Sequence, residues 1–220
     1  VGQQAVMNSA RPFARPGQTI GLLGGSFDPA HDGHVHITRE ALKRFDLDRV
    51  WWLVSPGNPL KTHGPAPLDK RMAQARRVMQ HPRVTVTDIE ARLGTRYTAQ
   101  TLKVLQAQFR GVRFVWLMGA DNLAQFDQWR GWRHIARQVP IAVIARPGYD
   151  RDAHASPAMS WLRRFVRPAR QAKNWTKWSL PALVLLRFRP DKTSATSLRA
   201  ADPGWHRRFT RARTPPRPDN

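Results

Sequence analysis

Two histidines follow a pair of glycines near the start of this 220-residue chain, and their types and spacing suit an anion site. The segment is GGSFDPAHDGH, residues 24–34. Glycines let the backbone approach a phosphate closely, and a helix that starts here adds oriented N–H donors. His31 and His34 lie three residues apart, so both can face one anion from the first helical turn. The segment therefore predicts a polyphosphate site, although it is neither a Walker A loop nor a GxGxxG fingerprint.

A second polar segment lies near the C-terminus, where the sequence reads TSATSLR over residues 193–199. Hydroxyl groups and N–H groups at a helix start suit a phosphate, and Arg199 adds a positive charge. The alternative is that Ser194, Thr196 and Ser197 only cap the last helix and that Arg199 is a solvated surface charge.

The first segment also has two alternatives. Its histidines and acids could be zinc ligands, because imidazoles and carboxylates are suitable donors. Glycines followed by serine after a strand could also be only a tight turn. Neither explains why the glycines, the histidines and the later polar segment occur together. The residues that a zinc site would use are Asp28, His31, Asp32, His34 and His36.

The composition bounds the class of protein. A chain of 25.2 kDa with 41% hydrophobic residues can form one domain with a single core. The absence of cysteine excludes a thiol nucleophile, a cysteine zinc site and an iron-sulfur cluster. No apolar run is long enough to span a membrane, and the first residues lack the pattern of a secretion signal. We expect a cytoplasmic location.

The net charge of +22 is unusual and raises the possibility of a polyanionic partner. A nucleic-acid-binding protein is therefore the rival class. No RNA-binding or helix-turn-helix signature is present, so we expect no specific nucleic-acid partner. The oligomeric state cannot be read from the sequence.

Apolar runs alternate with helical patterns along the chain, which predicts an α/β fold with a Rossmann-like, doubly wound parallel sheet. Such a sheet binds ligands beyond the carboxyl ends of its strands, where the strand order reverses. Residues 150–180 have no assignable pattern. Strands are expected at 19–23, 49–54, 84–87, 112–118, 141–145 and 182–186, and helices at 34–45, 68–80, 98–109 and 129–138. The expected division is a flexible N-terminal extension at 1–18, one domain at 19–205 and a basic, proline-rich tail at 206–220.

The two polar segments, in this order, resemble the HxGH and SxxxR-like signatures of the nucleotidyltransferase superfamily. Segments 89–102, 114–129 and 145–148 narrow the resemblance to the bacterial nicotinate-nucleotide adenylyltransferases. That resemblance implies transfer of AMP from ATP to nicotinate mononucleotide, with Mg²⁺ bound to ATP and with release of pyrophosphate. Nicotinamide mononucleotide and phosphopantetheine remain as alternative acceptors.

The resemblance also assigns roles to single residues. The catalytic residues would be His31, His34, Lys61 and Arg199. ATP would bind to Gly24, Gly25, Ser26, Phe27, His31, His34, Gly119, Asp121, Ser194, Thr196 and Arg199. The acceptor would bind to Tyr97, Thr98, Trp129 and Arg146, with Trp129 stacked on the pyridine ring. No general base is implied, because the attacking phosphate is already ionised.

The chain departs from the family pattern at two places, and some of these residues have structural alternatives. Residues 58–61 read NPLK where the family commonly has PPHK, which retains Lys61, and Ala195 replaces one hydroxyl of the last motif. Trp129 could belong to an aromatic helical stripe in the core. Asp121 could be the N-cap of a helix that starts at Asn122, Thr98 could only start a helix, and Arg146 could lie in an ordinary turn.

Overall fold

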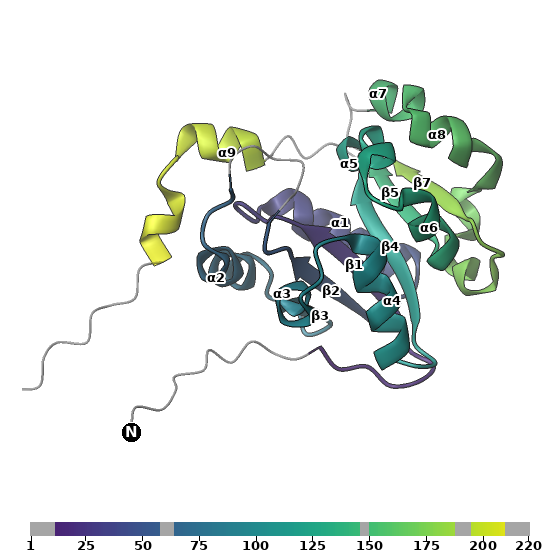
Figure 1. Ribbon diagram of the computed structural model, residues 1–220, viewed down its shortest axis with the longest axis horizontal. Coiled ribbons are helices and arrows are strands. Elements are labelled where there is room, and N and C mark those ends of the chain that lie inside the picture. The colour runs from purple at the N-terminus through teal and green to yellow at the C-terminus, as the bar shows by residue number, and fades with distance from the viewer. Residues whose placement is uncertain (1–11, 58–63, 146–149, 188–194, 210–220) are drawn as a thin grey trace, which may run out of the picture.

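A computed structural model of the chain describes residues 12–57, 64–145, 150–187 and 195–209. A seven-stranded, all-parallel sheet lies between two layers of helices (Figure 1). The strands are β1 Thr19–Gly25, β2 Arg49–Val54, β3 Val84–Thr87, β4 Arg113–Gly119, β5 Ile141–Ala145, β6 Val166–Arg167 and β7 Leu183–Arg187.

The strand order is β3-β2-β1-β4-β5-β7-β6. Strands β2 and β3 thus lie on one side of β1, and β4 to β7 lie on the other. This order confirms the doubly wound α/β fold. The order reverses between β1 and β4, whose parallel register aligns Leu23 with Leu117. Ligands of such sheets bind beyond the carboxyl ends of the strands at this point.

The helices cover both faces of the sheet. Helix α1, helix α2 and the 3₁₀ segment η3 pack on one face, and α3 to α8 pack on the other. The C-terminal η4 contacts α2 (Figure 1). The bounds are α1 Asp32–Arg44, α2 Leu68–Val78, α3 Ile89–Leu93, α4 Thr98–Gln108, α5 Ala120–Ala124, η1 Phe126–Gln128, α6 Trp132–Gln138, α7 Asp150–Ala155, α8 Pro157–Leu162, η2 Arg163–Phe165, η3 Ala169–Lys177, α9 Ala195–Ala201 and η4 Trp205–Phe209.

Strand β2 shows why the strands read as continuous apolar runs. Trp51 and Leu53 join the core on one face, while Val50, Trp52 and Val54 join the core on the other. Successive side chains of a strand point to opposite faces, and both faces of this sheet are covered. The sequence therefore shows no polar alternation along this strand.

The segment that had no assignable pattern wraps around the edge of the sheet. Helices α7 and α8 pack on one face, β6 pairs with β7 at the edge, and η3 packs on the other face. The buried Trp175 of η3 donates its indole N–H to the Phe45 carbonyl at 3.0 Å. Short helices, 3₁₀ turns and a two-residue strand carry no period that a sequence pattern can detect.

Several elements differ from the sequence expectation. The helix expected from residue 129 begins at Trp132, because Trp129 lies in extended backbone after η1. Strand β1 continues to Gly25, so both glycines end the strand instead of following it. Helix α1 starts two residues early, at Asp32, and the sheet has a seventh strand, β6.

Part of the expected N-terminal extension is described. Pro12 is buried, and the Gly17 N–H donates to the Gly111 carbonyl at 2.8 Å. Among the described residues, no helix is both long and apolar enough to cross a membrane.

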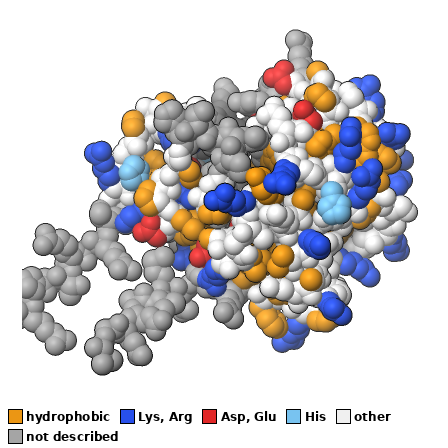
Figure 2. All heavy atoms as spheres, viewed as in Figure 1, with side chains coloured by type: hydrophobic (Ala, Val, Ile, Leu, Met, Phe, Trp, Pro, Cys, Tyr) orange, Lys and Arg blue, Asp and Glu red, His pale blue; other side chains and the backbone are white. Residues whose placement is uncertain are grey.

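The surface carries the positive charge that the composition indicates. Figure 2 shows Lys and Arg side chains over much of the visible face and few acids. The guanidinium groups of Arg133, Arg137 and Arg164 all lie within 5.9 Å of the Trp161 ring centroid. Cation–π contacts of this kind hold arginines against aromatic surface without acidic partners.

Candidate active site

A pocket of about 620 Å³ opens at the carboxyl ends of β1, β2 and β4, where the strand order reverses. All the predicted site residues that the structure describes line it: Gly24, Gly25, Ser26, Phe27, His31, His34, Tyr97, Thr98, Gly119, Asp121, Trp129, Thr196 and Arg199. Lys61, Arg146 and Ser194 lie outside the described residues.

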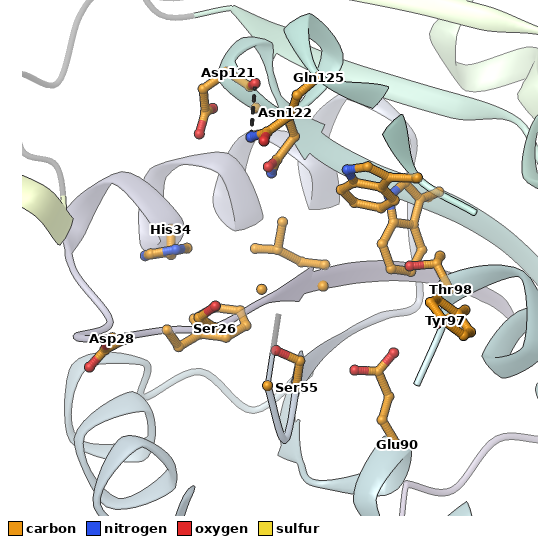
Figure 3. Close-up of a pocket in the computed structure, with 18 of the residues that line it drawn as sticks. Ser26, Asp28, His34, Ser55, Glu90, Tyr97, Thr98, Asp121, Asn122 and Gln125 are labelled. Atoms are coloured by element: carbon orange, nitrogen blue, oxygen red, sulfur yellow. Dashed lines mark hydrogen bonds between the residues drawn. The ribbon is translucent and has the colours of Figure 1, made fainter. Parts of the chain in front are cut away.

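Two walls of the pocket differ in composition. The histidine wall consists of residues 24–28 with His31, His34, Thr196 and Arg199. The aromatic wall consists of Glu90, Tyr97, Thr98, Trp116, Trp129 and Arg130. Figure 3 shows His34 on one side of the pocket and Tyr97 with Thr98 on the other.

Residue 24, near the end of β1, must be glycine because the indole ring of Trp116 packs against it. A Cβ atom at residue 24 would lie 2.5 Å from Cη2 of Trp116, and Trp116 is 1% exposed. Phe27 then turns the chain with a φ of +47°, which is uncommon for a bulky side chain. Backbone of this kind costs about 1–3 kcal/mol and persists where the surrounding structure holds it in place.

Two histidines cap helix α1 and fix one another. His31 is the N-cap residue, and its Nδ1 accepts the Gly33 N–H at 3.1 Å. The His31 backbone N–H donates to His34 Nδ1 at 3.3 Å, which completes a capping box. Ser or Thr and Glu or Gln usually take these two positions. Because both Nδ1 atoms accept, each neutral imidazole carries its proton on Nε2 and is a donor there.

Packing holds the His34 ring in place. Its centroid lies 3.9 Å from that of His31 and 4.6 Å from that of Phe27. The Thr38 hydroxyl donates to the His34 carbonyl at 2.8 Å and accepts the Trp52 indole N–H at 2.7 Å. The first turn of α1 is therefore fastened to strand β2.

The C-terminal motif reaches the same wall. The Arg199 guanidinium donates to the Asp28 carbonyl, and its Nη1 lies 3.9 Å from the Asp28 carboxylate. Its Nη2 also donates to the Thr196 hydroxyl at 3.4 Å. The structure thus brings together two motifs that lie at opposite ends of the sequence.

A buried arginine that the sequence did not indicate supports the histidine wall from behind. Arg71 of α2 is 1% exposed and donates to the carbonyls of Ser26 and Ser55 at 2.7 Å and of Ala66 at 2.6 Å. Burial lowers the pKa of Arg71 below its ordinary value, and the charge of Asp28 opposes this effect. Arg71 thus joins the loops that follow β1 and β2. Nothing in the sequence distinguishes it from the surface arginines.

The aromatic wall is assembled from several elements. Tyr97 is the N-cap residue of α4, and α4 starts at Thr98 as expected. Trp129 lies after η1 and meets Trp116 at 6.2 Å in a T-shaped contact. The Arg130 guanidinium lies 4.9 Å from the Tyr97 ring centroid. These rings offer flat apolar surface that suits an aromatic ligand.

Glu90 is a second functional candidate that the sequence did not indicate. It lies in α3, a five-residue helix that no pattern predicted, and its Oε1 accepts the Thr101 hydroxyl at 3.0 Å. Burial raises the pKa of Glu90 to about 7, and the hydrogen bond from Thr101 opposes the shift. A carboxyl group with such a shift in a pocket is a functional candidate.

The turn after β4 forms a third side of the pocket. Helix α5 begins at Ala120 with Gly119 as N-cap residue, so the alternative in which Asp121 caps a helix starting at Asn122 is wrong. A Cβ atom on Gly119 would lie 2.3 Å from Asp121 Oδ1. The absence of a side chain at 119 therefore makes room for the Asp121 carboxylate. The Gln125 amide donates to the Asp121 carbonyl (Figure 3).

The alternative zinc site does not form. In the described part of the chain, no three or more His, Asp or Glu residues come close enough to hold a metal ion. The Nδ1 atoms of His31 and His34 are also occupied by backbone N–H groups.

A doubly wound parallel sheet, with a histidine-capped first helix and an arginine from the C-terminal motif in one pocket, defines a nucleotidyltransferase fold. A solved nicotinic acid mononucleotide adenylyltransferase from Plasmodium falciparum, complexed with NaAD, has this fold. Its TM-score to this chain is 0.63 at 15% identity, over 83% of each chain.

Comparison with known sequences defines the family. The model of the cytidylyltransferase-like family matches residues 22–201. A Roseobacter denitrificans protein named "Probable nicotinate-nucleotide adenylyltransferase" is 57% identical over 90% of this chain and 100% of its own length. A Cereibacter sphaeroides protein of the same name is 58% identical over 82% of this chain and 96% of its own. The chain belongs to the cytidylyltransferase-like family and, within it, to the nicotinate-nucleotide adenylyltransferases.

Proposed function

We propose that this protein joins nicotinate mononucleotide to the AMP part of ATP, which yields nicotinic acid adenine dinucleotide and pyrophosphate. The observation that carries the proposal is one pocket with a donor-rich histidine wall and, facing it, an aromatic wall. The names of the 57–58% identical relatives support it. Solved structures of the same fold, with NaAD and with APC, are consistent with both substrates.

The reaction needs positioning more than proton transfer. A phosphate oxygen of nicotinate mononucleotide attacks the α-phosphorus of ATP, and the bond from that phosphorus to the oxygen shared with the β-phosphate breaks. Pyrophosphate leaves with the electron pair of this bond. Because the attacking phosphate is already ionised, no general base is required. Catalysis then comes from bringing two anions together in line and from stabilising the charge that develops.

The histidine wall supplies groups for that task. The Nε2–H groups of His31 and His34 would donate to phosphate oxygens, and their direction is set by the hydrogen bonds at Nδ1. Asp28 orients the Arg199 guanidinium, which would neutralise phosphate charge. We expect Lys61 to contact a phosphate as well.

The aromatic wall would bind the acceptor. Trp129 and Tyr97 offer ring faces for the pyridine, and Arg146 is expected near the carboxylate or phosphate of the acceptor. Of the remaining predicted ATP contacts, Gly119 and Asp121 would lie near the ribose. The cytoplasmic location also stays a prediction.

We further propose that Mg²⁺ enters with ATP as part of the substrate. The carboxyl groups on the described lining belong to Asp28, Glu90 and Asp121, and they do not gather into a group of metal ligands, which fits an ion held mainly by phosphates and water. Bound in this way, Mg²⁺ would neutralise charge on the departing pyrophosphate.

The test is pyrophosphate release from MgATP with three acceptors offered separately: nicotinate mononucleotide, nicotinamide mononucleotide and phosphopantetheine. We expect kcat/KM to be at least about tenfold higher for the nicotinate compound, a difference of about 1.4 kcal/mol. Release only with another acceptor would overturn the assigned substrate. No release with any acceptor would overturn the proposed reaction and favour the nucleic-acid alternative.

A further inference from the structure

Glu90 is a buried acid in the pocket that the proposed mechanism does not use. It is 8% exposed, and Figure 3 shows its carboxyl group pointing into the pocket from α3. Of the other acids on the described lining, Asp28 lies in the loop after β1 and Asp121 lies in α5. Glu90 therefore places an acid on the aromatic wall itself.

A chain of hydroxyl groups fixes the Glu90 carboxyl group. Thr101 donates to Oε1 at 3.0 Å, and its own oxygen lies 2.9 Å from the Thr95 hydroxyl. The Thr95 backbone N–H also donates to the Glu90 carbonyl at 3.0 Å. Either hydroxyl can donate in the contact between them, because Thr95 also lies 3.4 Å from the Glu90 carbonyl and Thr101 lies 3.4 Å from the Tyr97 carbonyl. The carboxyl group is thus held at a defined place whether or not it is ionised.

The surroundings disfavour the ionised form of Glu90. Strand β2 presents apolar Trp51 and Leu53 to α3, and α4 presents Thr101. Burial accordingly raises the pKa of Glu90 to about 7. The charged or titratable groups nearby include Asp88 before α3 and Arg92 within it, which pair with each other, and the exposed Lys103 of α4. Those on the pocket lining are Arg96 and Tyr97 before α4, Arg130 after η1, and Asp121 of α5.

The two pyridine acceptors differ only at the ring substituent, which is a carboxylate in one and a carboxamide in the other. Their shared phosphate matches the cations of the histidine wall, so the ring and its substituent would lie at the aromatic wall. A carboxylate can only accept hydrogen bonds, whereas a carboxamide both donates and accepts. A proton on a neighbouring carboxyl group therefore matters more for the carboxylate acceptor.

We propose that Glu90 is a specificity-determining residue, which admits the nicotinate carboxylate in its protonated form and disfavours it, relative to nicotinamide, in its ionised form. The proton stays on Glu90 or is shared in the hydrogen bond, and no group is transferred. This inference rests on the proposed function, because it needs a pyridine acceptor in the pocket.

The test is the ratio of kcat/KM for nicotinate mononucleotide to kcat/KM for nicotinamide mononucleotide, measured from pH 6 to 9 on the full chain. Effects of pH on ATP, on the shared acceptor phosphate and on the histidine wall cancel in this ratio. For the wild type we expect the ratio to fall at least about tenfold as the pH rises past 7. In Glu90→Gln, which keeps an acceptor for Thr101, the ratio should not change with pH.

Two further variants sharpen the test. Thr101→Val removes the hydrogen bond that opposes the pKa shift, so the midpoint of the fall should move to higher pH. Asp121→Asn removes an acid on another side of the pocket and should keep the wild-type slope. If Glu90→Gln does not fold, the Thr101→Val midpoint decides.

The outcomes separate this inference from the proposed function. A pH-independent ratio in an active wild type overturns the inference alone, and so does a wild-type slope in Glu90→Gln. An unmoved midpoint in Thr101→Val overturns it as well. Absence of pyrophosphate release with both acceptors at every pH overturns the proposed function and this inference with it.

Discussion

The two walls of the pocket are fixed in different ways. Backbone groups fix the histidine wall: the imidazoles of His31 and His34 accept backbone N–H groups, and Arg71 binds three loop carbonyls with short hydrogen bonds. Ring contacts and one buried carboxyl group form the aromatic wall. Donors that must point at a developing charge need fixed directions, because preorganised donors cost no reorganisation during the reaction. A ligand ring that binds by stacking needs only a flat aromatic surface, without donors of fixed direction.

Arg71→Met should have the largest effect if the histidine wall depends on its support. The substitution leaves the carbonyls of Ser26, Ser55 and Ala66 without their donor and Asp28 without a buried counter-charge. Loss of one partner from a buried charged network costs about 3–5 kcal/mol. We expect a free energy of unfolding lower by that amount, measured by urea denaturation.

Arg77→Met is the matched control, because Arg77 is exposed on the same helix. It should change the free energy of unfolding by less than about 0.5 kcal/mol. Equal stability of the two variants would show that the loops after β1 and β2 keep their conformation without Arg71.

His34→Ala tests the donors of the histidine wall. It removes the Nε2–H donor and the acceptor of the His31 N–H. Loss of one well-placed donor costs about 2.7–4 kcal/mol in the transition state, so kcat should fall at least about a hundredfold. The melting temperature should show that the variant still folds. His134→Ala, on the exposed side of α6, should retain full activity, and near-normal kcat in His34→Ala would contradict the assigned role.

The same difference between the walls explains what the sequence could predict. Residues 24–34 form one continuous motif, so its glycines, histidines and helix start could be read together, and Gly24, Gly25, His31 and His34 line the pocket. The aromatic wall is assembled from α3, α4, β4 and η1. Glu90 was missed because α3 has too few residues to show a period, and Trp129 was expected in a helix because η1 and α6 together imitate helical spacing.

Arg71 shows a further limit. Its role depends on carbonyl groups from loops that only the folded sheet brings together, and a backbone carbonyl leaves no trace in residue type. The alternation of strands and helices, by contrast, follows from burial on both faces, which is why the doubly wound fold class could be predicted from apolar runs.

Glu90→Gln should change how stability depends on pH. The folded pKa of about 7 lies above the ordinary value of 4.5, so the unfolded chain releases this proton first. The folded state therefore binds more protons between these values, and this group lowers stability as the pH rises through that window. A shift of this size corresponds to about 3 kcal/mol.

The glutamine variant has no such penalty. Its free energy of unfolding relative to the wild type should rise by up to about 3 kcal/mol between pH 4.5 and pH 8. Urea denaturation at the two pH values measures this change. The control is Asp152→Asn, at an exposed site. Its free energy of unfolding should differ from that of the wild type by the same amount at both pH values. A relative stability that falls with pH would contradict the burial of this carboxyl group.

Trp129→Ala should have the smallest effect of the four substitutions. It should also distinguish the functions of the two walls most directly. The indole meets Trp116 and Phe126 in T-shaped contacts away from the histidines, so we expect its removal to leave the histidine wall intact. Stacking on an aromatic side chain is worth about 1–3 kcal/mol per base. The KM for the acceptor should therefore rise by roughly 5- to 150-fold while the KM for ATP stays within about twofold. Trp132→Ala, in the same aromatic cluster but outside the pocket lining, should lower stability and leave both KM values unchanged. If Trp129→Ala raised both KM values together, the two walls would not bind their substrates independently. The backbone support of the histidine wall would then not explain how the two walls differ.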